Sequence, residues 1–174
     1  MIKIKSIKNR ASMTMNYIRD SYWNLDKVYS LFKKNKNKNK YFIINKHKIK
    51  TSSHKNSLFM LNYEKNKGKC KCDLCGIEAT YIVLEKSNVN DSDIYHFNLY
   101  TVDKKTKNEI YFNIDHIKPR SKGGKNELNN MQLTCELCNS KKADNHNNLN
   151  YYIFKIKKIF KNFLNKIKIK QILK

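Results

Sequence analysis

The stretch that decides the fold is residues 115–142, DHIKPRSKGGKNELNNMQLTCELCNSKK. It contains a Cys-x-x-Cys pair, Cys135 and Cys138, and 59 residues separate this pair from an earlier one, Cys72 and Cys75. Each pair can present two thiolates to one tetrahedral zinc, so the spacing predicts a structural zinc bound by four cysteines. Because the two-residue spacing pairs Cys72 with Cys75, we expect Cys70 to be a free thiol.

Two other uses of these cysteines fit the sequence less well. A redox Cys-x-x-Cys motif requires a thioredoxin-like context that this sequence lacks, and it leaves the second pair unexplained. A disulfide scaffold does not suit a reducing compartment. Structural zinc is therefore the interpretation that uses both pairs.

The interval between the two cysteine pairs is β-rich. Residues 81–84 and 94–102 have strand composition, and residues 109–115 (EIYFNID) alternate apolar and polar side chains. The turn-rich segment 103–108 joins the last two, which predicts a β-hairpin.

Residues 115–142 resemble the HNH endonuclease signature, in the subgroup whose ββα-metal motif is braced by a four-cysteine zinc. The resemblance is specific over 115–142 and extends plausibly over 70–144. It implies an α+β fold with a small ββα-metal module, and cleavage of a phosphodiester with one catalytic divalent metal. Many members have His where this chain has Asp or Asn.

The resemblance assigns roles residue by residue. Asp115 and Asn139 would bind the catalytic metal, and two oxygen donors favour Mg²⁺ or Mn²⁺. His116 would be the general base that activates water, and Asn130 would hold the loop and the orientation of His116. Four basic side chains are expected to contact nucleic acid: Lys118, Arg120, Lys122 and Lys142.

Elementary chemistry supports the same assignment. Attack on a phosphodiester needs a base that titrates near neutrality, as imidazole does, and a cation to stabilise developing charge. Adjacent strand residues point to opposite faces, so Asp115 and His116 can serve one site only where the strand ends or twists. Pro119 and the Gly123–Gly124 pair just beyond favour such an ending.

Charge suggests three segments. The chain of 174 residues carries a formal net charge of +23. Residues 1–69 hold 18 basic and 3 acidic side chains, residues 70–144 hold 11 of each, and residues 145–174 hold 8 lysines and no acid. We therefore expect a basic N-terminal arm over 1–69, a nuclease domain over 70–144 and a basic C-terminal helix over 145–174.

Periodicity places helices in both flanks. Leu25, Val28, Tyr29 and Phe32 have the spacing of an amphipathic helix, with Ser21 or Asn24 as its N-cap. Residues 33–40 (KKNKNKNK) read as a solvated linker, and residues 41–44 and 58–63 fit either a strand or a helix. Apolar residues recur every three or four positions from 149 to 167, which predicts a basic amphipathic helix.

These features predict the partner and the compartment. The longest apolar runs are four residues, and residues 1–10 lack the apolar centre of a secretory signal, so we expect an intracellular protein without a membrane partner. The compartment would be the cytoplasm of a bacterium or phage host, or an organelle with an AT-rich genome. We expect an endonuclease acting on double-stranded DNA, with a homing role as one option. The alternative is a catalytically silent zinc-ribbon module that only binds nucleic acid.

Overall fold

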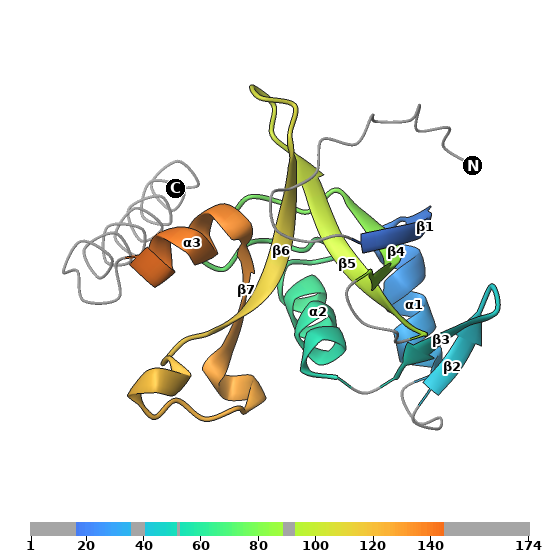
Figure 1. The fold of residues 1–174 in the computed structure, drawn as a ribbon, viewed down its shortest axis with the longest axis horizontal. Coiled ribbons are helices and arrows are strands. Elements are labelled where there is room, and N and C mark those ends of the chain that lie inside the picture. The colour runs from blue at the N-terminus through green and yellow to red at the C-terminus, as the bar shows by residue number, and fades with distance from the viewer. Residues whose placement is uncertain (1–16, 36–40, 52, 89–92, 145–174) are drawn as a thin grey trace, which may run out of the picture. The chain divides into compact units, whose positions relative to one another are not determined.

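The fold is a mixed α+β arrangement built on one curled sheet (Figure 1). The computed structural model describes residues 17–35, 41–51, 53–88 and 93–144, which contain seven strands, three α-helices and two 3-10 helices. The strands are β1 (Tyr17–Trp23), β2 (Tyr41–Ile44), β3 (His47–Lys50), β4 (Tyr81–Ser87), β5 (Ile94–Val102), β6 (Glu109–His116) and β7 (Met131–Cys135). The helices are α1 (Leu25–Asn35), α2 (His54–Lys65), α3 (Glu136–Asp144), η1 (Arg120–Lys122) and η2 (Leu128–Asn130). The chain divides into two compact units, Met1–Glu136 and Leu137–Lys174, and the seven described strands all belong to the first.

The sheet forks at the β5–β6 hairpin. Its main path runs β1-β4-β5-β3-β2, while β6 pairs with β5 and then with β7. The β5–β6 pairing covers only the register from Tyr100↔Tyr111 to Val102↔Glu109, and from Phe112 onward β6 pairs with β7 instead. Figure 1 shows β6 and β7 diverging from β5, with α2 in the space between them. The fork therefore separates the end of β6, which carries the predicted catalytic pair, from the main sheet.

Helix α1 covers the apolar face of the main sheet. Val28 and Phe32 are buried, and Asn24 Oδ1 accepts a hydrogen bond from the backbone N–H of Lys27 at 2.8 Å. This confirms the predicted helix and selects Asn24 as its N-cap. The Phe32 ring packs edge-on against rings from three other elements, at centroid distances of 5.7–6.0 Å: Phe42 of β2, Phe59 of α2 and Phe97 of β5.

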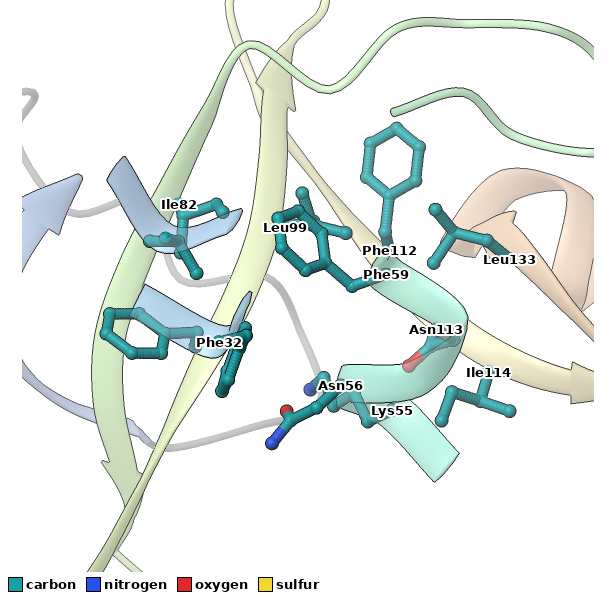
Figure 2. A pocket seen from close by; sticks show the side chains of 12 residues that line it. Phe32, Lys55, Asn56, Phe59, Ile82, Leu99, Phe112, Asn113, Ile114 and Leu133 are labelled. Carbon is teal, nitrogen blue, oxygen red and sulfur yellow. The ribbon is translucent and has the colours of Figure 1, made fainter. Parts of the chain in front are cut away.

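The core between α1, α2 and the sheet is closely packed. It encloses a cavity of about 10 Å³, the size of a single water molecule. Figure 2 shows four of the lining side chains, Phe32 of α1, Ile82 of β4, Leu99 of β5 and Phe112 of β6. A cavity of this size holds no substrate, so the functional site has to be sought on the surface of the fold.

The other face of the sheet carries a buried polar network centred on Glu85. The Arg19 guanidinium donates to both carboxylate oxygens of Glu109, at 3.0 and 2.8 Å, and its Nε lies 3.3 Å from Glu85 Oε2. Glu85 Oε1 accepts from Asn98 Nδ2 at 2.5 Å and from the Tyr100 hydroxyl at 2.6 Å. Burial raises the pKa of Glu85. The network ties β1 to β4, β5 and β6.

The predicted strands and hairpin are confirmed as β4, β5 and β6. The turn closes with Asp103 N donating to Asn108 O at 2.8 Å. The two ambiguous segments resolve as strand β2 for residues 41–44 and as part of helix α2 for residues 58–63. Of the lysine-rich run, residues 33–35 end α1 and residues 36–40 lie outside the described part of the chain, as does the predicted C-terminal helix over 145–174.

The domain boundary expected after residue 69 rests on the distribution of charge along the sequence and stays a prediction. In the fold, the described residues before it share a sheet with those after it, because β1 pairs with β4 and β3 pairs with β5. They include three strands as well as the helices α1 and α2. No helix in the described ranges is long and apolar enough to cross a membrane.

Candidate metal centre and nuclease site

Four cysteines meet at one point. The Sγ atoms of Cys72, Cys75, Cys135 and Cys138 all lie within 4.8 Å of one another. The Cys75 and Cys135 sulfurs are 3.7 Å apart. Four sulfurs at the usual Zn–S distance of about 2.3 Å form a tetrahedron with an edge of about 3.8 Å. The cluster therefore has the size and donor set of a four-cysteine zinc site.

The first cysteine pair is fixed to β7 through Asp73. Its backbone N–H donates to Leu133 O at 2.7 Å, and its Oδ2 accepts from the Leu133 N–H at 2.8 Å. Within the pair, Gly76 N donates to Cys72 O at 2.9 Å, which closes the tight turn. Asp73 thus holds Cys72 and Cys75 against the strand that ends in Cys135.

Helix α2 holds the same segment from the other side. The Asn62 side chain is buried; its Nδ2 donates to Lys71 O at 3.0 Å and its Oδ1 accepts from Lys71 N at 2.8 Å. Both backbone groups of the residue before Cys72 are therefore satisfied by one amide. A buried, doubly bonded amide is a strong constraint on backbone position, because either lost bond leaves a buried polar group unpaired.

Cys70 stands apart from the four-cysteine cluster. Its thiol is fully buried and donates weakly to Phe59 O at 3.9 Å. Burial raises the pKa of this thiol to about 12, so it stays protonated. The predicted division between four metal-binding cysteines and one free thiol agrees with this geometry.

Asp115 and His116 are the last two residues of β6. They lie opposite Gln132 and Met131 of β7, and the strand ends at His116, as the sequence predicts for two adjacent residues that serve one site. The carboxylate of Asp115 accepts a hydrogen bond from Gln132 Nε2 at 2.7 Å. The Nε2 atom of His116 lies 3.1 Å from Asn126 Oδ1. Each of the two side chains is thus oriented by an amide.

Asn130 fastens the loop that follows β6. Its Oδ1 accepts from Lys118 N at 2.9 Å, while its Nδ2 donates to Lys118 O at 3.0 Å and to Lys125 O at 2.8 Å. Its backbone oxygen accepts from Ile117 N at 2.8 Å. One side chain therefore spans both ends of the 118–125 loop, which is the loop-holding role that the resemblance assigns to it.

The loop also depends on Gly124. The backbone there passes so close to the chain that a Cβ atom would overlap the carbonyl oxygens of Lys118 and Pro119. Its N–H donates to Pro119 O at 2.9 Å. The predicted loop-forming role of Gly123–Gly124 therefore has a steric basis at the second glycine.

The remaining predicted residues are distributed over η1 and α3. Lys118, Arg120 and Lys122 are exposed on the loop beyond β6. Asn139 follows Cys138 in α3 and is half-buried, while the Lys142 side chain is only 4% exposed. The structure brings Asp115, His116 and Asn130 to one strand end. The roles of Asn139 as a metal ligand and of Lys142 as a phosphate contact stay predictions.

Sequence reasoning missed the side chains that orient the site. Gln132 and Asn126 lie within the stretch that resembles the HNH signature, but their contacts depend on the β6–β7 register and on the path of the loop. Asp73 lies between Cys72 and Cys75, and nothing in the sequence indicated its hydrogen bonds to Leu133. Asn62 carried no signal, because asparagine is abundant in this chain.

Comparison with known proteins gives a family match over one part of the chain. Residues 103–145 match the family model described as HNH endonuclease, which covers β6, the loop with η1 and η2, β7 and the described α3. Searches of curated proteins and of solved structures gave no match. The matched residues contain the paired Asp115 and His116 and the second cysteine pair of the four-cysteine cluster. Residues 103–145 of this chain are therefore an HNH endonuclease domain.

Proposed function

We propose that this chain is an endonuclease that hydrolyses phosphodiester bonds in double-stranded DNA. The observation that carries the proposal is the end of β6, where Asp115 and His116 lie side by side within the HNH domain and each is oriented by an amide side chain. An oriented imidazole next to an oriented carboxylate supplies a base and a metal ligand for water attack on a phosphodiester.

His116 is the proposed general base. The tautomer of His116 that donates from Nε2 to Asn126 Oδ1 has its lone pair on Nδ1, and this is the form proposed to take a proton from water. The loop that places Asn126 is the one that Asn130 fastens, so Asn130 acts through this loop on the orientation of His116. Asn130 is thus a positioning residue.

Asp115 and Asn139 are the proposed ligands of the catalytic metal. A carboxylate and an amide oxygen are hard donors that fit Mg²⁺ or Mn²⁺, and such an ion would stabilise negative charge on the phosphoryl oxygens. Gln132 orients the Asp115 carboxylate from the facing strand. On α3, Asn139 directly follows Cys138, so a zinc ion in the four-cysteine cluster would fix the backbone from which Asn139 extends.

The loop between β6 and β7 is the proposed contact with the DNA backbone near the site. Lys118, Arg120 and Lys122 are exposed there, and lysine binds phosphate as a point charge. Lys142 is a proposed fourth contact. A role in a mobile element or phage is a separate hypothesis that genomic neighbourhood tests, because a reading frame inside an intron or phage genome would support it.

Plasmid cleavage tests the proposed function. We expect the parent protein to relax or linearise supercoiled plasmid in Mg²⁺, and we expect His116→Ala and Asp115→Ala to lose this activity while they keep one zinc per chain and the parent's circular dichroism. His54→Ala, at an exposed histidine of α2, is the matched control and should cut like the parent. Equal cutting by His116→Ala and the parent would refute the proposal. Binding without any cutting by the zinc-loaded parent would favour the silent zinc-ribbon alternative.

A further inference from the structure

The β2–β3 hairpin presents two contrasting faces. Phe42 and Ile49 lie opposite each other in the register and are buried toward the core. The two neighbouring pairs, Tyr41↔Lys50 and Ile43↔Lys48, alternate to the other side, and Ile43 is 70% exposed. We call these four residues the hairpin face. A two-stranded ribbon with one buried and one outward face has the dimensions to approach the groove of a DNA duplex.

The hairpin face carries two lysines and no acidic side chain of its own. Residues 41–50 contain three lysines and no acid. Among the described residues, no carboxylate forms an ion pair with Lys48 or Lys50. Other described lysines do have acidic partners, namely Lys65, Lys69, Lys71, Lys86 and Lys125. Two acidic residues near the hairpin have other partners, since Asp20 pairs with His47 and Asp93 lies 3.6 Å from Lys86. Lys48 and Lys50 are therefore available to an anionic partner.

The neighbouring basic residues on β5 and α2 add little to this charge. His96 is on β5, which pairs with β3 in parallel, and its pKa is lowered first by burial and then by the charges of Lys55 and Lys50. The Lys55 amine is buried, where it donates to Asn98 and to the Tyr111 hydroxyl. Glu85, which pairs with His96 across β4 and β5, is fully buried in its network with Arg19. It presents no exposed carboxylate to this region.

Helix α2 connects the hairpin to the nuclease site. The Asn56 amide donates to Lys50 O at 2.6 Å and to Thr51 O at 3.3 Å, so the end of β3 is fastened to the first turn of α2. The same helix contacts η2, which contains Asn130, and β7. In Figure 1 the hairpin and the β6–β7 loop lie on opposite sides of α2. Both basic segments belong to the first unit of the chain and rest on one helix.

We propose that the hairpin face binds the sugar-phosphate backbone of the DNA duplex, through Lys48 and Lys50, at a position away from the scissile phosphate. This inference rests on the proposed function and adds a second contact surface to the cleavage site. Lysines make point contacts with phosphates, so the surface contributes affinity and orientation without reading bases. The duplex would then be held at two places on one compact unit, the β6–β7 loop and the hairpin.

Salt-dependent DNA binding tests this surface. Fluorescence anisotropy with a labelled duplex is measured on the full zinc-loaded chain carrying His116→Ala, which prevents cutting. Lys48→Gln with Lys50→Gln is compared with Lys27→Gln plus Lys34→Gln, which removes the same charge from exposed positions on α1. If each hairpin lysine neutralises one phosphate, the slope of log K against log salt shrinks by about 0.9 for each lysine, and affinity at about 0.1 M salt falls roughly eightfold for each.

The outcomes separate the two proposals. A loss confined to the hairpin variant supports the inference. An equal loss of affinity in the α1 variant would show a general charge effect, and no loss in either variant would show that the hairpin does not contact DNA. Either result overturns the inference. Plasmid cutting by the active parent would still uphold the proposed function. If the parent binds single-stranded RNA more tightly than the duplex, and the hairpin variant loses affinity only for that RNA, the proposal that the hairpin face binds a DNA duplex is overturned. A zinc-loaded parent that neither binds nor cuts DNA refutes both.

Discussion

Gln132 and Asp115 face each other across the β6–β7 ladder, and Gln132 Nε2 donates to Asp115 Oδ2 at 2.7 Å. Gln132 is buried, at 7% exposure, so its amide is held in place by packing. A buried donor that orients a carboxylate limits the directions from which that carboxylate can bind a cation. Residues of this kind influence metal affinity without touching the metal.

Replacement of Gln132 by leucine should impair metal binding at the nuclease site. Leucine has a similar volume but no donor, so we expect cleavage to fall about 10- to 100-fold at limiting Mg²⁺, with partial recovery at high Mg²⁺. Thr134→Val removes a hydroxyl from the same face of β7 without touching Asp115, and should keep the parent's metal dependence. Mg²⁺ titrations of plasmid cleavage measure the effect. An unchanged Mg²⁺ midpoint in Gln132→Leu would show that the hydrogen bond does not tune the carboxylate.

The five cysteines should divide into two classes on substitution. Cys135→Ser removes one of four sulfurs that lie within 4.8 Å of one another, so we expect loss of bound zinc and destabilisation by several kcal/mol. Cys70→Ala removes only a buried, protonated thiol, and should keep one zinc per chain at a cost of about 1 kcal/mol. Zinc content by mass spectrometry and unfolding in urea measure both. Zinc loss in Cys70→Ala would contradict the assignment of ligands.

Part of this fold could be predicted because its signals are local. The spacing of Leu25, Val28 and Phe32 predicted α1, and the cysteine pairs predicted the metal centre. Strand β1 was not predicted, because its position depends on long-range contacts of Arg19 with Glu109, ninety residues away. Net charge grouped this segment with the basic residues 1–69, and in the structure the segment pairs with β4 as strand β1.

In the candidate site, too, some residues have a local sequence signal and others depend on contacts between distant parts of the chain. The candidate residues Asp115, His116 and Asn130 could be named from the sequence because residues 115–142 hold a recognisable pattern, and their proposed chemistry follows from residue type. The residues that orient them could not be named, because the contact between His116 Nε2 and Asn126 Oδ1 depends on loop geometry that no spacing rule specifies. The hairpin face likewise depends on strand register, since a shift by one residue would bury its lysines.

Lys55 should make the protein more stable as pH rises from about 8 to 10. Its amine donates to Asn98 and to the Tyr111 hydroxyl, and burial lowers the pKa of Lys55 to about 8 from an ordinary 10.5. In this window the unfolded chain binds the proton that the folded chain has released, so the free energy of unfolding increases with pH. Above pH 10 the raised pKa values of Tyr17 and Tyr111, both about 12, act in the opposite direction.

Comparison with Lys55→Met isolates this contribution. The difference in unfolding free energy between the parent and the variant should shift in favour of the parent by about 2 kcal/mol from pH 8 to pH 10. Urea denaturation of both proteins at the two pH values measures this difference. Zinc content is followed in parallel, and titration of the cysteine ligands cancels because it affects the parent and the variant equally. A difference that stays constant across the window would mean that the Lys55 amine keeps its ordinary pKa in the fold.

The two adjacent glycines of the β6–β7 loop should respond differently to substitution. Gly124→Ala places a Cβ atom onto the backbone oxygens of Lys118 and Pro119, which no side-chain rotation can relieve, so the loop must open. Gly123 has the left-handed conformation at φ 76° and ψ 23°, and the nearest atom to an added Cβ is Lys118 Nζ at 3.9 Å. Asparagine tolerates that conformation, so Gly123→Asn should cost about 1 kcal/mol or less.

We expect Gly124→Ala to destabilise the loop by about 2 kcal/mol or more, because backbone overlap belongs to the severe classes of substitution. Opening the loop breaks the contacts of Asn130 with Lys118 and Lys125 and displaces Asn126 from His116. Cleavage should therefore fall with Gly124→Ala and survive in Gly123→Asn, and trypsin should cut the loop lysines faster only in the former. Equal cleavage rates and equal protease resistance in the two variants would show that the close backbone approach at Gly124 does not position the catalytic histidine.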